Sequence, residues 1–260
     1  MDTVSSSSIS LDEFVARLGS PDAPLLLDVR RDERFDEAQR IAPGALRCAP
    51  QDVAKFAREH EAREVIVYCV HGLEIGKEAA AQLRAAGWNA RWLAGGIDGV
   101  VEAGLPTIRK RDDLGVTGEQ ASRWITRARP KIDRIACPWL IRRFIDPRAE
   151  FFYVPVDQVF AEAKRLDAVP YDIPGAPIGH EGEHCSFDAL IAAFDLQGSA
   201  LDKLARIVRG ADTDRHDLAP QCAGLLAVSR GMSLLHQDDH AMLEATLPVY
   251  DALYAWCRRQ

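Results

Sequence analysis

Short apolar runs alternate with amphipathic stretches over the first hundred residues, and this alternation constrains the fold more than any other feature. The runs PLLLDVR, EVIVYC and ARWLAGG, at residues 24–30, 64–69 and 90–96, are bounded by charged or turn residues, as buried parallel strands usually are. Residues 10–18 and 76–87 have helical spacing, with a capping box at Ser10 and Glu13 and a stop at Gly87. We therefore expect an α/β domain in which helices flank a parallel sheet.

The composition indicates a globular chain of two domains. Of 260 residues, 47% are hydrophobic and 27% are charged, a balance that allows cores to be buried. The N-terminus has no basic segment followed by an apolar one, and no 18-residue stretch is free of charge, so we expect a cytoplasmic protein without a membrane segment. The six cysteines form no CxxC motif and indicate reduced thiols.

Charge is unevenly distributed along the chain. The formal net charge of -7 argues against nucleic-acid binding, yet residues 109–143 hold ten lysines and arginines against four acidic residues. Such local positive charge attracts a small anion or an acidic partner. We assign residues 109–111 to a solvated linker, and we expect domains at residues 8–108 and 129–260 with a linker over residues 109–128.

A cysteine lies where a predicted strand ends. Cys69 closes the run EVIVYC, and the loop after it leads into a helix. At this edge of a parallel sheet, unpaired N–H groups and the helix dipole favour negative charge, so a thiolate would be stabilised. The predicted active-site loop consists of Val70, His71, Gly72, Leu73 and Glu74. Cys69 is thus a candidate nucleophile, and the alternative is a buried cysteine that only packs.

Three separated motifs resemble those of the rhodanese-like (thiosulfate:cyanide sulfurtransferase) domain. They are LLLDVRRDERFDEAQRIAPGAL, VIVYCVHGLEIGKEAAAQL and LAGGIDGVVEAGLP, in the order and spacing of that family over about residues 8–108. The resemblance implies that Cys69 takes a sulfur atom from a small donor, carries it as a persulfide and passes it to a protein or thiol acceptor. It also matches Asp28 and Arg30 to the family's structural DVR element, and residues 43–45 to its PGA turn.

Two departures from the family pattern bear on activity. Active relatives commonly have arginine at the last loop position, where it helps to hold an anionic sulfur donor, whereas this chain has Glu74. A carboxylate there repels thiosulfate and opposes the helix dipole. Val100 replaces the usual tryptophan after the GG turn, and His71 would compensate in part as a hydrogen-bond donor or acid. We expect weak or donor-restricted sulfur transfer.

The second half of the chain is predicted to be mainly α-helical. Helical periodicity extends over residues 156–166, 186–194, 199–210, 219–235 and 238–259, with Ser, Asp or Pro near the helix starts. The run AEFFYVP at residues 149–155 is the one strand that we predict in this half.

The stretch HEGEH at residues 180–184 matches both orders of the zinc-hydrolase helix motif. Prolines and glycines crowd the surrounding segment, which disfavours a helix there, and a metal-dependent hydrolase is the least favoured function. A metal site built from loops is the stronger hypothesis. Its candidate ligands are His180, Glu183, His184, Asp212, Asp214 and His216.

Three of these six candidates come from the segment ADTDRHD at residues 211–217, where they stand at every second position. In an extended segment Asp212, Asp214 and His216 would share one face and, with the HEGEH residues, suit a divalent zinc, iron or manganese ion. The alternative is that the aspartates cap helix ends and His216 is a surface histidine. No organic cofactor is predicted.

The segments RPKIDRIACPWLIRRFIDPRAEFFYVP, HCSFDALIAAF and RGADTDRHDLAPQCAGLLAVSRGMS resemble the C-terminal domain of the ChrB family of chromate-resistance proteins, over about residues 129–258. The resemblance implies a role in chromate resistance or chromate sensing. ChrB regulators carry a DNA-binding region ahead of this domain, and here the rhodanese-like segment takes its place. We therefore expect no nucleic-acid partner and no membrane partner.

Arginines near a predicted helix at residues 138–145 are candidates for binding an oxyanion, because guanidinium groups match tetrahedral anions. These are Arg134, Arg142 and Arg143. Two hypotheses remain open. In the first the chain is a sulfurtransferase-like protein of chromate resistance, with Cys69 as persulfide carrier and a metal-binding C-terminal domain. In the second it is a non-catalytic chromate, oxyanion or metal sensor whose rhodanese loop is silenced by Glu74.

Overall fold

The computed structural model describes residues 7–260, and its contacts divide the chain into two compact units. The first unit extends to Lys110 and includes residues 117–119 and 143–146, and the second comprises residues 111–116, 120–142 and 147–260. Residues 1–6, on which part of the targeting-signal argument depends, lie outside the described residues. Within residues 7–260, no helix has both the length and the apolarity needed to cross a membrane.

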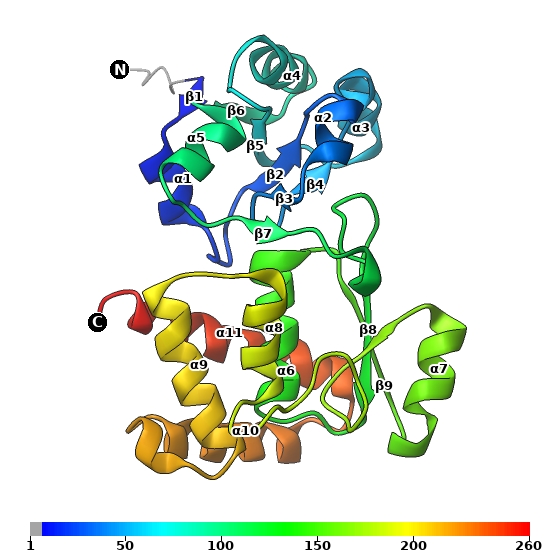
Figure 1. Cartoon of the computed structure of the whole chain (residues 1–260), viewed down its shortest axis with the longest axis vertical. Coiled ribbons are helices and arrows are strands. Elements are labelled where there is room, and N and C mark those ends of the chain that lie inside the picture. The colour runs from blue at the N-terminus through cyan, green and yellow to red at the C-terminus, as the bar shows by residue number, and fades with distance from the viewer. Residues whose placement is uncertain (1–6) are drawn as a thin grey trace. The chain divides into compact units, whose positions relative to one another are not determined.

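A parallel five-stranded sheet forms the centre of the first unit (Figure 1). Its strands lie in the order β1-β6-β5-β2-β4. Their bounds are β1 Ser8–Ile9, β2 Leu25–Asp28, β4 Leu46–Arg47, β5 Glu64–Tyr68 and β6 Asn89–Leu93. The three apolar runs of the sequence therefore provide the three central strands. A short antiparallel pair, β3 Arg40–Ile41 with β7 Ile108–Arg109, completes the strands of this unit.

Helices cover both faces of this sheet, because successive strand residues point to opposite sides. On one face, α1 (Leu11–Arg17) and α5 (Gly96–Glu102) pack against a cluster that includes Ile66. On the other, α3 (Val53–Glu59) and α4 (Glu74–Ala85) pack against a cluster that includes Val65 and Val67. The helical segments Asp32–Glu37 (α2) and Pro50–Asp52 (η1) complete the unit. The predicted α/β class is confirmed.

Helices form most of the second unit, as the sequence predicted. Their bounds are α6 Asp133–Leu140, α7 Val159–Leu166, α8 Ser186–Phe194, α9 Ser199–Asp212, α10 Cys222–Leu235 and α11 Asp239–Cys257. Shorter helical turns are η2 Asp112–Leu114, η4 Val156–Gln158 and η5 His216–Leu218. A π-helical turn, η3 Ile141–Ile145, follows α6, and its last three residues are assigned to the first unit. The Trp139 ring of α6 stacks on Phe187 of α8 and contacts Tyr250 of α11. These three helices therefore share one aromatic core.

The second unit also contains a parallel three-stranded sheet, of which the sequence predicted one strand. Its order is β10-β8-β9, with bounds β8 Arg123–Arg127, β9 Glu150–Val154 and β10 Val169–Pro170. The central strand β8 falls inside residues 109–128, so the segment expected to be a linker is only partly one. Trp124, Ile125 and Thr126 are all buried, because α8 contributes Phe194 against Trp124 while α7 covers Ile125. Burial on both faces removes the alternation that identifies a strand.

Helix α6 begins at Asp133, earlier than the predicted start near Pro138. Proline lacks an N–H, so Pro138 leaves the carbonyl of Arg134 without its helical donor. The hydroxyl of Tyr171 donates to that carbonyl at 3.3 Å and replaces the lost hydrogen bond. The helix therefore continues through the proline, and Asp133 lies in its first turn.

Candidate functional site

Cys69 follows β5 directly and lies at the carboxyl edge of the sheet, as the sequence predicted. Its carbonyl accepts a hydrogen bond from Ile97 N–H at 3.0 Å, and the carbonyl of Val70 accepts one from Asp98 N–H at 3.0 Å. These bonds tie the loop to the first turn of α5. A Cβ at Gly76 would lie 3.4 Å from the Cys69 sulfur, so the glycine leaves room for the thiol beside α4.

Two glycines allow the loop to pass close to the turn before α5. Gly72 and Gly96 both have positive φ, at 67° and 60°. A Cβ on Gly72 would lie 2.5 Å from the carbonyl oxygen of Leu93, and one on Gly96 would lie 2.4 Å from that of Val70. Both positions therefore require glycine for conformational and steric reasons.

A pocket of about 620 Å³ opens at Cys69. Its lining includes the predicted loop except Gly72, and also side chains that the sequence did not assign to the site, namely Arg30, Arg31, Arg34, Ile75 and Lys77. We call Arg31, Arg34 and Lys77 the basic wall. Arg34 pairs with Glu37 at 3.4 Å, whereas Arg31 has no ion-pair partner within the part of the chain that the structure describes. Glu74 lines the same pocket, so its negative charge is counteracted by the three positive charges of the basic wall.

The remaining pocket arginine, Arg30, is held in an ion pair inside the protein. Its guanidinium contacts both oxygens of the buried Asp28, and the hydroxyl of Tyr68 donates to Asp28 at 2.8 Å. Burial raises the pKa of Tyr68 well above its ordinary value, so the phenol stays a hydrogen-bond donor. This network fixes the ends of β2 and β5. In the loop, His71 Nδ1 lies 2.9 Å from Asp98 and is exposed.

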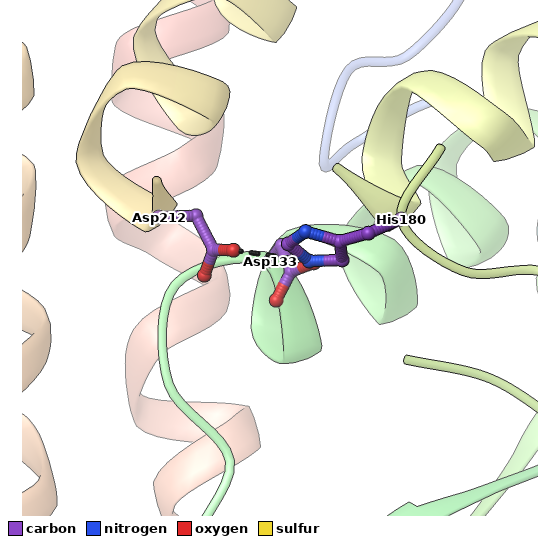
Figure 2. Close-up of side chains that lie close together, drawn as sticks. All are labelled: Asp133, His180 and Asp212. Carbon is purple, nitrogen blue, oxygen red and sulfur yellow. Dashed lines mark hydrogen bonds and ion pairs between the residues drawn. The ribbon is translucent and has the colours of Figure 1, made fainter. Parts of the chain in front are cut away.

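A second cluster of polar side chains lies in the helical unit, where His180 faces three aspartates. His180 Nε2 lies 3.3 Å from Asp133 Oδ2, 3.2 Å from Asp172 Oδ1 and 3.2 Å from Asp212 Oδ2. Figure 2 shows Asp133, His180 and Asp212 pointing toward one another from α6, from a loop and from the end of α9. Ligand atoms of these three residues lie within 4.8 Å of one another. The structure thus joins His180 and Asp212, as the metal hypothesis required.

The other four predicted ligands lie outside this cluster. Glu183 pairs with Arg215, His184 lies 3.8 Å from Asp188, and His216 lies 3.6 Å from Asp214. The HEGEH stretch forms a turn closed by Glu181 and His184, without the helix that a zinc hydrolase motif needs.

The expected one-face arrangement of Asp212, Asp214 and His216 is also incorrect. Helix α9 continues to Asp212, Asp214 adopts φ of 58°, and His216 begins a 3-10 turn. The segment is therefore not extended, and its three side chains do not share a face.

The cluster contains two residues that the sequence analysis missed, Asp133 and Asp172. Both are buried, at 1% and 5% exposure. The only sequence signal for them was an aspartate next to apolar residues in KIDRIACPW and YDIPG. Such an aspartate is unusual if the segment is buried, because aspartate is rarely buried without a partner. Asp172 forms ion pairs with Arg127 at 3.3 Å and Arg134 at 3.0 Å.

Two of the three arginines proposed for an oxyanion already have acidic partners. Arg134 is paired with Asp172, and Arg142 contacts Glu244 at 2.5 Å and lies over the ring of Phe151. Arg143 belongs to the first compact unit. Cys137, one turn after Asp133, is fully buried, and burial raises its pKa well above the ordinary value, so it packs as a neutral thiol.

Two aspartates of the cluster, Asp172 and Asp212, hold protons more tightly than ordinary carboxyls. Burial, followed by the charge of Asp133, raises the pKa of Asp172 to about 6 and that of Asp212 to about 7. The hydrogen bond to Asp133 raises the pKa of His180 to about 9. The arginines on Asp172 act in the opposite direction, and they limit its increase.

These pKa shifts predict how stability depends on pH in chelator-treated protein. Each group has a higher pKa folded than unfolded, where the ordinary values are 3.8 for aspartate and 6.5 for histidine. Each contribution is therefore full below the unfolded pKa and is lost as pH rises through about 6, 7 and 9. Relative to wild type, Asp212→Asn should gain stability between pH 5 and pH 8, with Tm rising by about 2–4 °C per kcal/mol. A Tm difference that is flat or falls with pH in thermal melts would contradict this expectation.

Comparisons with known proteins agree with the two compact units. Residues 124–257 match the model of the family described as "ChrB, C-terminal domain", and residues 10–103 match the rhodanese-like domain. Protein ChrB of Cupriavidus metallidurans is 33% identical over 182 residues, which cover 68% of this chain and 52% of that protein. The chain thus spans about half the length of this curated relative.

Solved structures with similarity to the chain correspond to part of its length. A full-length protein from Lactobacillus plantarum is 26% identical, covers 40% of this chain and 88% of its own, and has a TM-score of 0.37. A rhodanese-related protein from Thermoplasma volcanium is 22% identical, with coverages of 38% and 95% and a TM-score of 0.33. With the family match extending over half of its length, the chain belongs to the ChrB C-terminal domain family and carries a rhodanese-like domain ahead of that domain.

Proposed function

We propose that this chain acts in chromate resistance as a sulfur carrier of the rhodanese type, with Cys69 as the persulfide-bearing residue. The observation that carries the proposal is the position of Cys69 at the carboxyl edge of the sheet, inside a pocket with a basic wall. The chromate role rests on membership of the ChrB C-terminal domain family.

The proposed chemistry is nucleophilic transfer of one sulfur atom. The Cys69 thiolate attacks the outer sulfur of thiosulfate, the sulfur–sulfur bond of the donor breaks, and sulfite leaves with the electron pair. A protein or low-molecular-weight thiolate then attacks the outer sulfur of the persulfide and regenerates the Cys69 thiolate. The first turn of α4 faces the loop and favours the anionic states of this cycle.

The pocket is suited to an anionic donor in spite of Glu74. Arg31, Arg34 and Lys77 supply three positive charges against two carboxylates, those of Glu74 and of Glu37, the exposed partner of Arg34, since Arg30 is neutralised by Asp28. The basic wall comes from α2 and α4, so it takes over the attraction that the loop arginine supplies in active relatives. Glu74 still opposes the donor at the loop itself, which is why we expect slow or donor-restricted transfer.

A second candidate function, a non-catalytic sensor with a silenced loop, is favoured by the burial of the thiol. Cys69 is 4% exposed, and Glu74 stands beside the loop. In this case the C-terminal domain holds an oxyanion or a metal, and Cys69 forms no persulfide. The hydrolase hypothesis has no such support, because HEGEH forms a turn.

Intact mass spectrometry separates the two functions. The purified full chain is measured before and after incubation with thiosulfate and with an uncharged sulfur donor, and the modified peptide is sequenced. A carrier gains the mass of one sulfur atom on the peptide that contains Cys69, and dithiothreitol removes it. No gain of mass with either donor would reject the carrier function and leave the sensor.

The chromate role is tested in cells that lack this chain. Producing the chain there should raise the chromate concentration that permits growth, while tolerance of another oxidant, hydrogen peroxide, stays unchanged. Equal growth on chromate with and without the chain would contradict the role.

A further inference from the structure

His180 has too few N–H groups for the carboxylates that surround it. One atom, His180 Nε2, lies 3.2–3.3 Å from oxygens of three carboxylates. A protonated Nε2 carries a single hydrogen, so it donates a well-aligned hydrogen bond to one of the three. The other carboxylates converge on the same point but receive no second hydrogen from Nε2, and buried carboxylates of like charge repel one another.

The neighbouring cations do not resolve this convergence. Arg127 and Arg134 both pair with Asp172, and the hydroxyl of Ser186 also donates to Asp172 at 3.1 Å. Asp133 and Asp212 have no lysine or arginine partner within residues 7–260. Two carboxylates are therefore left with one imidazole as their only charged partner of opposite sign.

The spacing of these donor atoms fits one small cation. Zinc and similar ions bind imidazole nitrogen and carboxylate oxygen at about 2.0–2.2 Å, so two ligands at right angles are about 3 Å apart. The distances from His180 Nε2 to Asp133 Oδ2 and Asp212 Oδ2 are 3.3 Å and 3.2 Å. All three donors fall within 4.8 Å of one another. The two distances measured from Nε2 are therefore those expected between neighbouring ligands of one ion.

We propose that Asp133, His180 and Asp212 bind one divalent metal ion of the manganese, iron or zinc class. One nitrogen and two oxygens are a donor set that these ions accept, and the two carboxylate charges balance the charge of the ion. Three protein ligands leave at least one coordination position for water or a small oxyanion. The site lies in the helical unit and goes beyond the sulfur chemistry of Cys69, on which it does not depend.

The surroundings hold the donors in place and leave an entry path. Asp133 lies in the first turn of α6, directly after Ile132. The N–H of Ile132 donates to the hydroxyl oxygen of Ser229 at 2.9 Å, and the carbonyl of Ile132 accepts from the hydroxyl of Tyr250 at 2.6 Å. The backbone N–H of Ser186 donates to Asp133 at 3.3 Å. The His180 side chain is 41% exposed while that of Asp133 is 1% exposed, so an ion would enter past the histidine.

Metal titration of the full chain tests the proposal. The protein is treated with a chelator, dialysed, and titrated with Mn²⁺ or Zn²⁺ alone by calorimetry, and its metal content is measured after reloading. Wild type should bind one equivalent and melt at a higher temperature with metal than without. His180→Gln and Asp133→Asn should each weaken binding by about 100-fold or more, since loss of even an outer partner of a ligand weakens binding about 10–100-fold.

Matched controls come from the same loop as His180. Glu183→Gln and His184→Gln change two exposed candidates of the HEGEH stretch and should bind metal as wild type does. His180 is partly exposed, so its variant should fold even if Asp133→Asn does not, and circular dichroism checks each variant. The proposal is overturned if wild type binds no equivalent of metal, if His180→Gln binds like wild type, or if the two controls lose as much affinity as His180→Gln.

Discussion

A Cys69→Ser variant is expected to take up no sulfur from any donor, because serine oxygen cannot form a persulfide. Cys69 is 4% exposed. Because serine is close to cysteine in size and shape, the fold should be retained at this buried position. Wild type and variant are incubated with thiosulfate and with an uncharged donor, and intact mass and sulfite release are measured. Both signals should be absent from the variant.

Cys48→Ser is the matched control for this loss. Cys48 is also 4% exposed and lies after β4 in the same unit, but burial raises its pKa to about 11, so it remains a thiol at neutral pH. The control should load sulfur like wild type. Sulfur uptake that persists in Cys69→Ser and disappears in Cys48→Ser would move the carrier to the other cysteine and reject the proposed mechanism.

Local patterns were enough to predict the position of Cys69. The strand before it is an apolar run, the helix after it is rich in alanine, and both signals depend on neighbours in the sequence. The basic wall could not be predicted in this way. Arg31 and Arg34 reach the pocket from the N-cap and the first turn of α2, which follows a different strand, so their contribution depends on the pairing of β2 with β5.

The metal cluster was predicted in part for a related reason. His180 and Asp212 were both candidates, but the sequence could not indicate that α6 and a second loop bring Asp133 and Asp172 to the same point. The error over Asp214 and His216 has a local cause. Gly210 was taken as the end of a helix, whereas it lies inside α9. The position requires glycine because a Cβ there would lie 2.4 Å from the sulfur of Cys222 on α10. Close packing, rather than chain termination, explains that glycine.

The sequence predicted the helical character of the second unit because most of its helices bury one face only. The strand β8 was missed because it is buried on both faces and flanked by Arg123 and Arg127, whose charges resemble those of a solvated linker. Fully buried strands of five residues carry too little periodicity to be distinguished from other short apolar segments.

Glu74→Arg is expected to increase kcat/KM with thiosulfate by about 10-fold, since it reverses a charge that lines the Cys69 pocket. Two unit charges 4 Å apart interact by about 1 kcal/mol in water and more strongly near protein, and about 1.4 kcal/mol corresponds to a factor of ten. The distance from this side chain to the donor across the open pocket is greater than 4 Å, which weakens each interaction. The donor carries two negative charges, and the substitution changes repulsion to attraction, so the two effects offset each other. Steady-state kinetics with thiosulfate at low and high salt measures the effect, which should shrink as salt screens the charges.

Glu78→Arg provides the control, because it makes the same charge change on the exposed face of α4, one turn beyond Glu74 and outside the pocket lining. It should change kcat/KM far less than Glu74→Arg, and an uncharged sulfur donor should respond to neither variant. If the two variants have equal effects, net charge rather than the loop carboxylate limits the reaction. If Glu74→Arg has no effect while Cys69 still loads sulfur, the basic wall alone determines donor binding, and the glutamate is not the reason for slow transfer.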